Sequence, residues 1–186
     1  MEENKRIHTA KEEWDTYSDE YFAENASDEI IGCIIEDSMY NLVYTSNGVH
    51  VWIPDLLSMY KSFHRVLNKD GRHIMYEVHP VIRPLGDDDV PIITVRKPYA
   101  NINFTDDVQK FAWRIQDIFN AAFDARFNIT HMEEFHPDKN DHSLWFYKNQ
   151  AQAEADNYMK FDWKQNPWAV LPQWIGFSAR KDGGNI

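Results

Sequence analysis

The chain has 186 residues, of which 43% are hydrophobic and 26% are charged, and these proportions suit one globular domain around one hydrophobic core. Its net charge of −11, from 19 basic and 30 acidic residues, argues against binding to nucleic acid or to an anionic membrane surface. The single cysteine, Cys33, excludes an internal disulfide, and because there is neither a long apolar run nor an apolar leader we expect a cytoplasmic protein.

Two elements are predicted before residue 40. Thr9 and Glu12 have the spacing of a capping box, and an aromatic stripe of helical spacing follows at Trp14, Tyr17 and Tyr21. We interpret this stripe as a helix face that packs on the core. The β-branched run IIGCII, residues 30–35, predicts a strand.

The next predicted elements form a βαβ unit. NLVYTS predicts a strand over 41–46, and HIMYEVH predicts another over 73–79. Between them, residues 47–54 are expected to form a loop, and Asp55 caps a predicted helix over 56–67 that the sequence NKDG ends. Because a helix connects the two strands, we expect them to be parallel.

Beyond this unit the pattern is less regular. Residues 81–106 are rich in proline and aspartate and are expected to form an irregular insert. Apolar residues at helical spacing predict a long helix over 106–124, and alternation predicts a strand over 127–135. Residues 145–170 fit either a loop or a helix, and 174–181 predict a final strand.

Four stretches resemble a bacterial branch of the class I S-adenosylmethionine-dependent methyltransferases, the methyltransferase-11-like proteins: WDTYSDEYF, NLVYTSNGVHVWIPDL, RVLNKDGRHIMYEVHPVIRP and NPWAVLPQWIGFSARK. The resemblance implies an α/β fold in which NLVYTS is the fourth strand, HIMYEVH the fifth, and WIGFSARK the antiparallel seventh. We therefore expect a truncated Rossmann-like methyltransferase sheet, built from the second-half strands and mostly parallel with an antiparallel last strand. Helices are expected on both faces, in a single domain spanning 1–186.

The family's cofactor-binding segment has no counterpart in this sequence. The family holds S-adenosylmethionine with a glycine-rich turn after the first strand, yet none of the seven glycines here forms a GxG. Only 18 residues separate Phe22 from Asn41, whereas one βαβ unit needs at least ~30. In one alternative, Glu36 and Asp37 hold the cofactor ribose at the end of the strand over 30–35; in the other, they form a charged hairpin turn.

The resemblance also implies site residues. Substrate-binding groups would follow two neighbouring strands, at Asn47, Gly48, His50, Trp52, Glu77 and His79. Tyr17 and Tyr21 would close over the cofactor, and the insert over 81–106 would face the substrate. No side chain is assigned as catalytic. His50, Glu77 and His79 could also ligate zinc or iron, but their spacing matches no metal motif, so no metal site is predicted.

An aromatic cluster near the C-terminus has two interpretations. Its members are Trp145, Phe146, Tyr147, Tyr158, Trp163, Trp168 and Trp174. They could form a C-terminal core against the sheet, or a flat-walled pocket for a planar substrate.

The exposed edge of the strand over 41–46 predicts that a second protein chain pairs with the sheet. Without the family's first three strands, the strand over 41–46 has one bare edge, and a bare apolar edge invites another chain. We expect a homodimer, with exchange of the N-terminal segment as one form of it.

Three functions remain open from the sequence. The first is a methyltransferase-like protein whose methyl transfer is impaired or lost. The second is a non-catalytic dimeric module that binds a partner or a small ligand. The third is an active small-molecule methyltransferase whose cofactor site is completed by a partner subunit.

Overall fold

The computed structural model describes residues 40–46, 48–86, 92–103, 110–137 and 146–182. Several predictions lie outside these residues: the N-terminal helix and the strand over 30–35, and the positions of Tyr17, Tyr21, Glu36, Asp37, Asn47 and Trp145. None of the described helices is long and apolar enough to span a membrane.

Four strands form one mixed sheet in the order β1-β2-β4-β3. They are β1 (Tyr40–Ser46), β2 (Leu67–Val78), β3 (Phe127–Phe135) and β4 (Trp174–Lys181). The β1–β2 pair is parallel, and β4 is antiparallel to both of its neighbours. The predicted parallel unit and the antiparallel last strand are therefore confirmed, and β4 lies between β2 and β3.

The helix α3 (Leu56–Val66) connects β1 to β2 and begins where its cap predicts. Asp55 Oδ1 accepts a hydrogen bond from the Ser58 backbone N–H at 2.9 Å. The predicted end is slightly wrong, because Leu67 has extended backbone and already belongs to β2. NKDG is not a separate turn; its residues form a bulge, since Tyr40 pairs with Leu67 and Leu42 with Arg72.

A short helix, α2 (Val49–Trp52), replaces the predicted loop after β1. Gly48 precedes it with a φ of +96°, a left-handed conformation that a residue with a Cβ adopts only with strain. The chain thereby reverses within a few residues of the end of β1, and His50 is carried into the interior.

The helix α4 (Ile115–Asp124) begins nine residues later than predicted. Residues 110–114 are the described part of the stretch before α4. Here hydrogen bonds go to backbone carbonyls far away in the sequence instead of to the preceding helical turn. The Phe111 N–H donates to the Val51 carbonyl at 2.7 Å, and Trp113 Nε1 donates to the Ile53 carbonyl at 2.9 Å. These tertiary hydrogen bonds replace the intrahelical ones that the apolar spacing alone favours.

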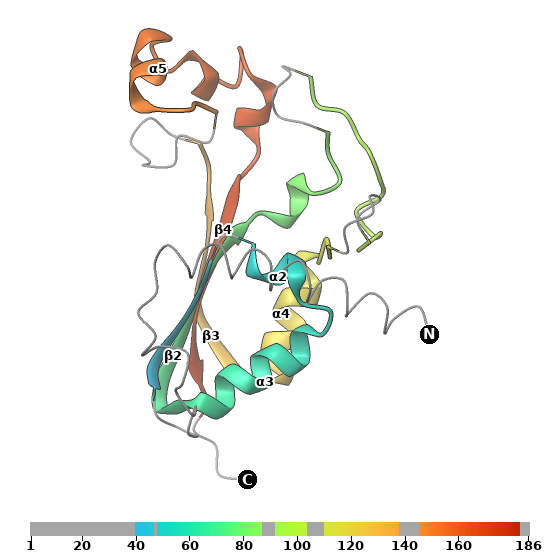
Figure 1. Ribbon diagram of the computed structural model, residues 1–186, viewed down its shortest axis with the longest axis vertical. Helices are drawn as coiled ribbons and strands as arrows, with labels where there is room; N and C mark the ends of the chain where they lie inside the picture. The colour runs from blue at the N-terminus through green and yellow to red at the C-terminus, as the bar shows by residue number, and fades with distance from the viewer. Residues whose placement is uncertain (1–39, 47, 87–91, 104–109, 138–145, 183–186) are drawn as a thin grey trace, which may run out of the picture.

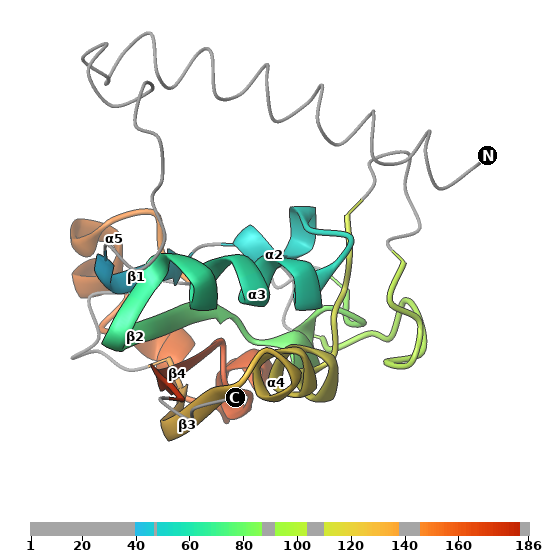
Figure 2. The ribbon, with the colours of Figure 1, turned by 90° about the horizontal axis from the view of Figure 1, so that it is seen from below.

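All three helices that cover the sheet lie on one side of it. Figure 1 shows α2, α3 and α4 on the same face, and Figure 2 shows the two long helices side by side. The core between them and the sheet contains Leu56, Tyr60, Leu67, Met75, Ile118, Ala122, Phe127, Ile175 and Phe177. Among the described residues the second face carries no helix, and the predicted N-terminal helix lies outside them, so the expectation of helices on both faces stays a prediction.

A second, smaller core lies at the far end of the sheet, where α5 (Gln150–Ala155) is seen in Figure 1. Phe146, Tyr147, Ala153 and Trp168 form its centre, and Ile82 and Leu85 of the insert pack against it. Three 3-10 turns complete this part: η1 (Pro80–Ile82), η2 (Met159–Phe161) and η3 (Pro167–Val170).

The predicted aromatic cluster is thus divided. Four of its members, Phe146, Tyr147, Tyr158 and Trp168, belong to or pack against the second core. Trp163 is 60% exposed, and Trp174 lies in β4, stacked on Tyr76 with ring centroids 4.9 Å apart.

Candidate functional site

Three of the predicted site residues meet at the carboxyl ends of β1 and β2. Glu77, from the end of β2, accepts a hydrogen bond on Oε2 from the Gly48 backbone N–H at 2.7 Å. Its other oxygen, Oε1, lies 3.1 Å from His50 Nδ1, at an angle outside the hydrogen-bond range. Glu77 and His50 are only 2% and 3% exposed. The sheet therefore brings a carboxylate and an imidazole together in the protein interior, as expected for adjacent parallel strand ends.

The phenol of Tyr60 lies on the other side of the imidazole. We call Gly48, His50, Tyr60 and Glu77 the buried group. Tyr60 Oη lies 2.8 Å from His50 Nε2, and Tyr60 itself is fully buried. Burial, and in second place the Glu77 carboxylate, raise the pKa of Tyr60 well above its usual range, so the phenol stays protonated. We assign the Tyr60 O–H as donor to Nε2, which leaves the imidazole proton on Nδ1, facing Glu77.

His79 does not join this group. Its Nε2 lies 2.8 Å from Glu134 Oε1, and its Nδ1 accepts a hydrogen bond from the Val81 N–H at 3.1 Å. The ring proton is therefore on Nε2, and the imidazole joins β2 to β3 at the start of η1. Burial lowers the pKa of His79, while the hydrogen bond to Glu134 acts in the opposite direction.

Trp52 is also apart from the buried group. Its ring lies below the ammonium of Lys110, 4.8 Å from Nζ to the ring centroid. This cation–π contact ties α2 to the extended chain before α4. Of the six residues predicted to line a substrate, the structure brings together Gly48, His50 and Glu77, places Trp52 and His79 elsewhere, and does not describe Asn47.

Sequence reasoning missed two contributors to the buried group. Tyr60 lies on the apolar, buried side of α3, and the available signal was that a buried tyrosine hydroxyl needs a polar partner. Arg83 follows η1 in the irregular insert, where no pattern identifies it. Burial lowers the pKa of its guanidinium, and the Glu77 carboxylate acts in the opposite direction.

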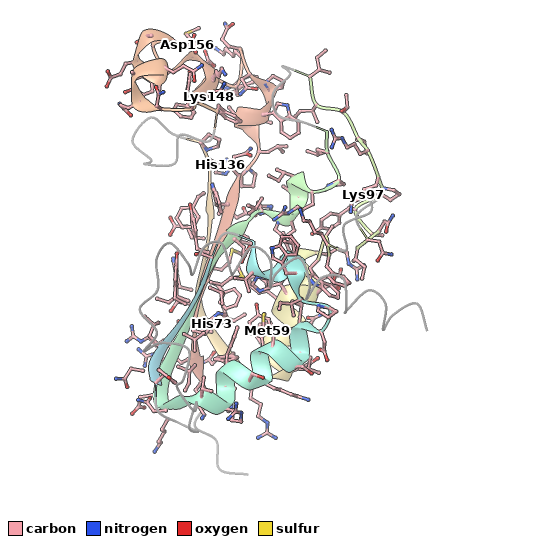
Figure 3. The ribbon with its side chains drawn as sticks, viewed as in Figure 1. Met59, His73, Lys97, His136, Lys148 and Asp156 are labelled. Carbon is pink, nitrogen blue, oxygen red and sulfur yellow. The ribbon has the colours of Figure 1, made fainter. Side chains whose placement is uncertain are left out.

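A third buried histidine, His73, lies between the sheet and α3. His73 Nε2 lies 3.1 Å from Thr45 Oγ1, and its ring packs edge-on against Tyr60 and Phe177. Figure 3 shows His73 on the helix-covered side of the sheet. Burial, followed by the neighbouring His50, lowers the pKa of His73 to about 3, so the ring is neutral and part of the core.

The buried group is arranged to position the chain rather than to react. His50 has a carboxylate on one side and a phenol on the other, so neither ring nitrogen faces solvent. Glu77 engages the Gly48 N–H and thereby holds the left-handed turn between β1 and α2. Its buried negative charge lies against an imidazole edge and a backbone amide, which lowers the cost of its burial.

The described residues do not match a cofactor cradle for S-adenosylmethionine. Gly48 is the only described glycine with a positive φ, and its amide is occupied by Glu77 instead of facing a ligand. It opens a helix of only four residues. Nor does the described part of the chain group three histidine, cysteine or carboxylate side chains so that they could hold a metal ion.

Two solved methyltransferase structures are similar in fold to this chain. A proposed S-adenosylmethionine dependent methyltransferase from Listeria monocytogenes matches 81% of this chain with a TM-score of 0.56 and 22% identity. An S-adenosylmethionine dependent methyltransferase from Mesorhizobium loti matches 80% with a TM-score of 0.54 and 19% identity. This chain spans 65% of the length of each. No protein-family profile matches the sequence, and no curated protein matches it significantly.

The likeness shows the fold. The mixed four-stranded α/β sheet is similar in fold to these two methyltransferase structures, and the similarity covers about 80% of the chain. The expected methyltransferase-like, Rossmann-like architecture is thus confirmed at the level of the fold.

Proposed function

We propose that this chain is a methyltransferase-like protein that keeps the acceptor side of the fold and does not transfer methyl groups by itself. The observation that carries the proposal is the hydrogen bond between Glu77 and the Gly48 N–H. It fills, with the chain's own carboxylate, a backbone donor at the strand end where the fold's ligands bind.

The buried histidine supports the same conclusion. Methyl transfer is an in-line displacement, so it requires that donor and acceptor be held in line, and its acceptor often needs a base. His50 is the only titratable side chain of the predicted substrate set that is buried beside Glu77, and its two ring nitrogens face Tyr60 and Glu77. It therefore has no open position from which to take a substrate proton.

The test is a calorimetric titration of the full chain with S-adenosylmethionine and, separately, with its demethylated product. We expect no heat of binding at millimolar ligand, and adenosine triphosphate serves as a control for general nucleotide binding. Binding of either ligand in the micromolar range would overturn the proposal. It would instead favour an active enzyme whose cofactor site is completed by a partner subunit.

A second candidate, a dimeric interaction module, is favoured by the edge of the sheet. In the described part of the chain β1 pairs only with β2, so its other edge offers unpaired backbone groups beside the exposed side chains of Leu42 and Tyr44. We propose that a second copy of the chain pairs with this edge. Light scattering at micromolar concentration tests this, and a monomer there would contradict it.

A further inference from the structure

The face of the sheet that no described helix covers is apolar along one side and basic along the other. Strand register places Leu42 and Tyr44 of β1 beside Arg72 and Ile74 of β2 on this face. Leu42 is 50% exposed and Tyr44 58%, which is unusual for residues of this kind on the broad face of a sheet. We call this surface, made by Leu42, Tyr44, Arg72, Ile74, Ser178 and Arg180, the open face.

Two arginines lie directly opposite each other on the open face. Arg72 of β2 pairs in register with Arg180 of β4, and both side chains are exposed. Like charges opposite each other across an antiparallel pair repel, so this pair costs stability unless an anion lies nearby. Neither guanidinium forms an ion pair with any of the residues that the structure describes. Of the acidic residues near this pair, Asp70 lies two residues before Arg72 in β2, and Glu133 of β3 already lies 3.5 Å from His131.

The acidic residues of this chain are concentrated before β1. Residues 1–39 contain twelve acidic and three basic residues, a net charge of −9 out of the whole chain's −11. The remaining residues, 40–186, therefore carry a net charge of only −2. The same segment contains the predicted aromatic stripe at Trp14, Tyr17 and Tyr21 and the apolar run over 30–35.

We propose that residues 1–39 of this chain dock on the open face of its own sheet. The apolar residues of the segment would cover Leu42, Tyr44 and Ile74, while its acidic residues would neutralise the Arg72–Arg180 pair. The segment ends directly before Tyr40, the first residue of β1, so it joins the sheet at the margin of this face. A short connection of this kind gives a high effective concentration, which favours docking within one chain over docking between two.

The native cysteine allows a direct test in the full chain. Cys33 is the only cysteine, so a nitroxide can be attached there without any mutation. Paramagnetic broadening is then measured at the Ile74 methyls on the open face and at the Ile118 methyls, which are buried under the helices. We expect strong broadening at Ile74 and much weaker broadening at Ile118.

A charge-reversed variant distinguishes docking from mere tethering. R72E/R180E keeps the like-charge pair but reverses its sign, and it should lose most of the broadening at Ile74. The matched control, K61E/K148E, makes the same change of charge at two exposed lysines away from the open face and should keep it. Equal broadening in the two variants would overturn the proposal, as would the lack of broadening at Ile74 in the unmutated chain.

A mixed sample separates docking within a chain from exchange between chains. Nitroxide-labelled chain without isotopes is mixed with isotope-labelled C33S chain and equilibrated. We expect no broadening at Ile74 in this sample. Broadening there would show that the segment of a second copy occupies the face, and it would overturn docking within one chain.

Discussion

Glu77 and Gly48 are 29 residues apart in sequence, and one hydrogen bond of 2.7 Å joins them at the carboxyl ends of β1 and β2. The carboxylate of Glu77 is 2% exposed, and it engages a backbone amide in the left-handed region. This contact couples the only described turn with a positive-φ glycine to the centre of the sheet, so we expect both stability and the position of α2 to depend on it.

Replacement of Glu77 tests this dependence. Glu77→Ala should lower the free energy of unfolding by about 3 kcal/mol, because the Gly48 N–H and the His50 imidazole lose a buried partner. Glu77→Gln keeps an acceptor for the amide and should lose less. Urea unfolding measures both, and the exposed Glu133→Ala serves as control, with a change within about 0.5 kcal/mol. If Glu77→Ala were as stable as that control, the contact would have no structural role.

The hydroxyl of Tyr60 is the second test of the buried group. Tyr60→Phe keeps the ring in the core but leaves His50 Nε2 without its partner, which should cost about 1–2 kcal/mol of unfolding free energy. Tyr44→Phe removes the same hydroxyl from an exposed ring and should change the unfolding free energy by less than about 0.5 kcal/mol. Equal effects of the two substitutions in thermal or urea unfolding would contradict the assigned hydrogen bond.

His73 should make the fold sensitive to acid. Its pKa is about 3 in the folded chain and about 6.5 when unfolded, so below pH 6.5 the unfolded state binds a proton that the folded state does not. The contribution of His73 to the free energy of unfolding is therefore fully present above pH 6.5. It falls as the pH drops from 6.5 toward 3, by up to about 1.4 kcal/mol per pH unit.

The difference between His73→Phe and the unmutated chain isolates this effect. Phenylalanine keeps an aromatic ring against Tyr60 and Phe177 and removes the titration. We expect the variant to have a flatter profile of unfolding free energy between pH 6.5 and 4, while the exposed His131→Gln keeps the slope of the unmutated chain. Parallel profiles for the unmutated chain and His73→Phe would show that His73 is not the source.

Asp55 should contribute to stability as the cap of α3. Its carboxylate accepts hydrogen bonds from the Ser58 N–H and hydroxyl, and these hydrogen bonds lower the pKa of Asp55. Asp55→Ala should cost about 1 kcal/mol at neutral pH, and Asp55→Asn clearly less. Because the folded pKa is lowered, this contribution is present above the unfolded pKa of Asp55 and is lost as the pH falls through its folded value. An Asp55→Ala variant that unfolds like the unmutated chain in urea would refute the role of the cap.

Local signals in the sequence determined most of the secondary structure. β1, β3 and β4 follow from β-branched or alternating runs of residues, and the beginning of α3 follows from Asp55 as an N-cap. These signals act between residues that are neighbours in the chain, so they can be recognised without knowledge of the fold. The parallel β1–β2 pair follows as well, since a connection through a helix leaves little choice.

Contacts between distant residues decided the rest. α4 begins at Ile115 because Phe111 and Trp113 donate hydrogen bonds to the carbonyls of Val51 and Ile53, about 60 residues away. In the candidate site, adjacent strand ends predicted that His50 and Glu77 would meet, but not that Tyr60 would complete the group. Hydrogen bonds of this kind satisfy buried polar atoms only after the chain has folded, so no local pattern of residues announces them.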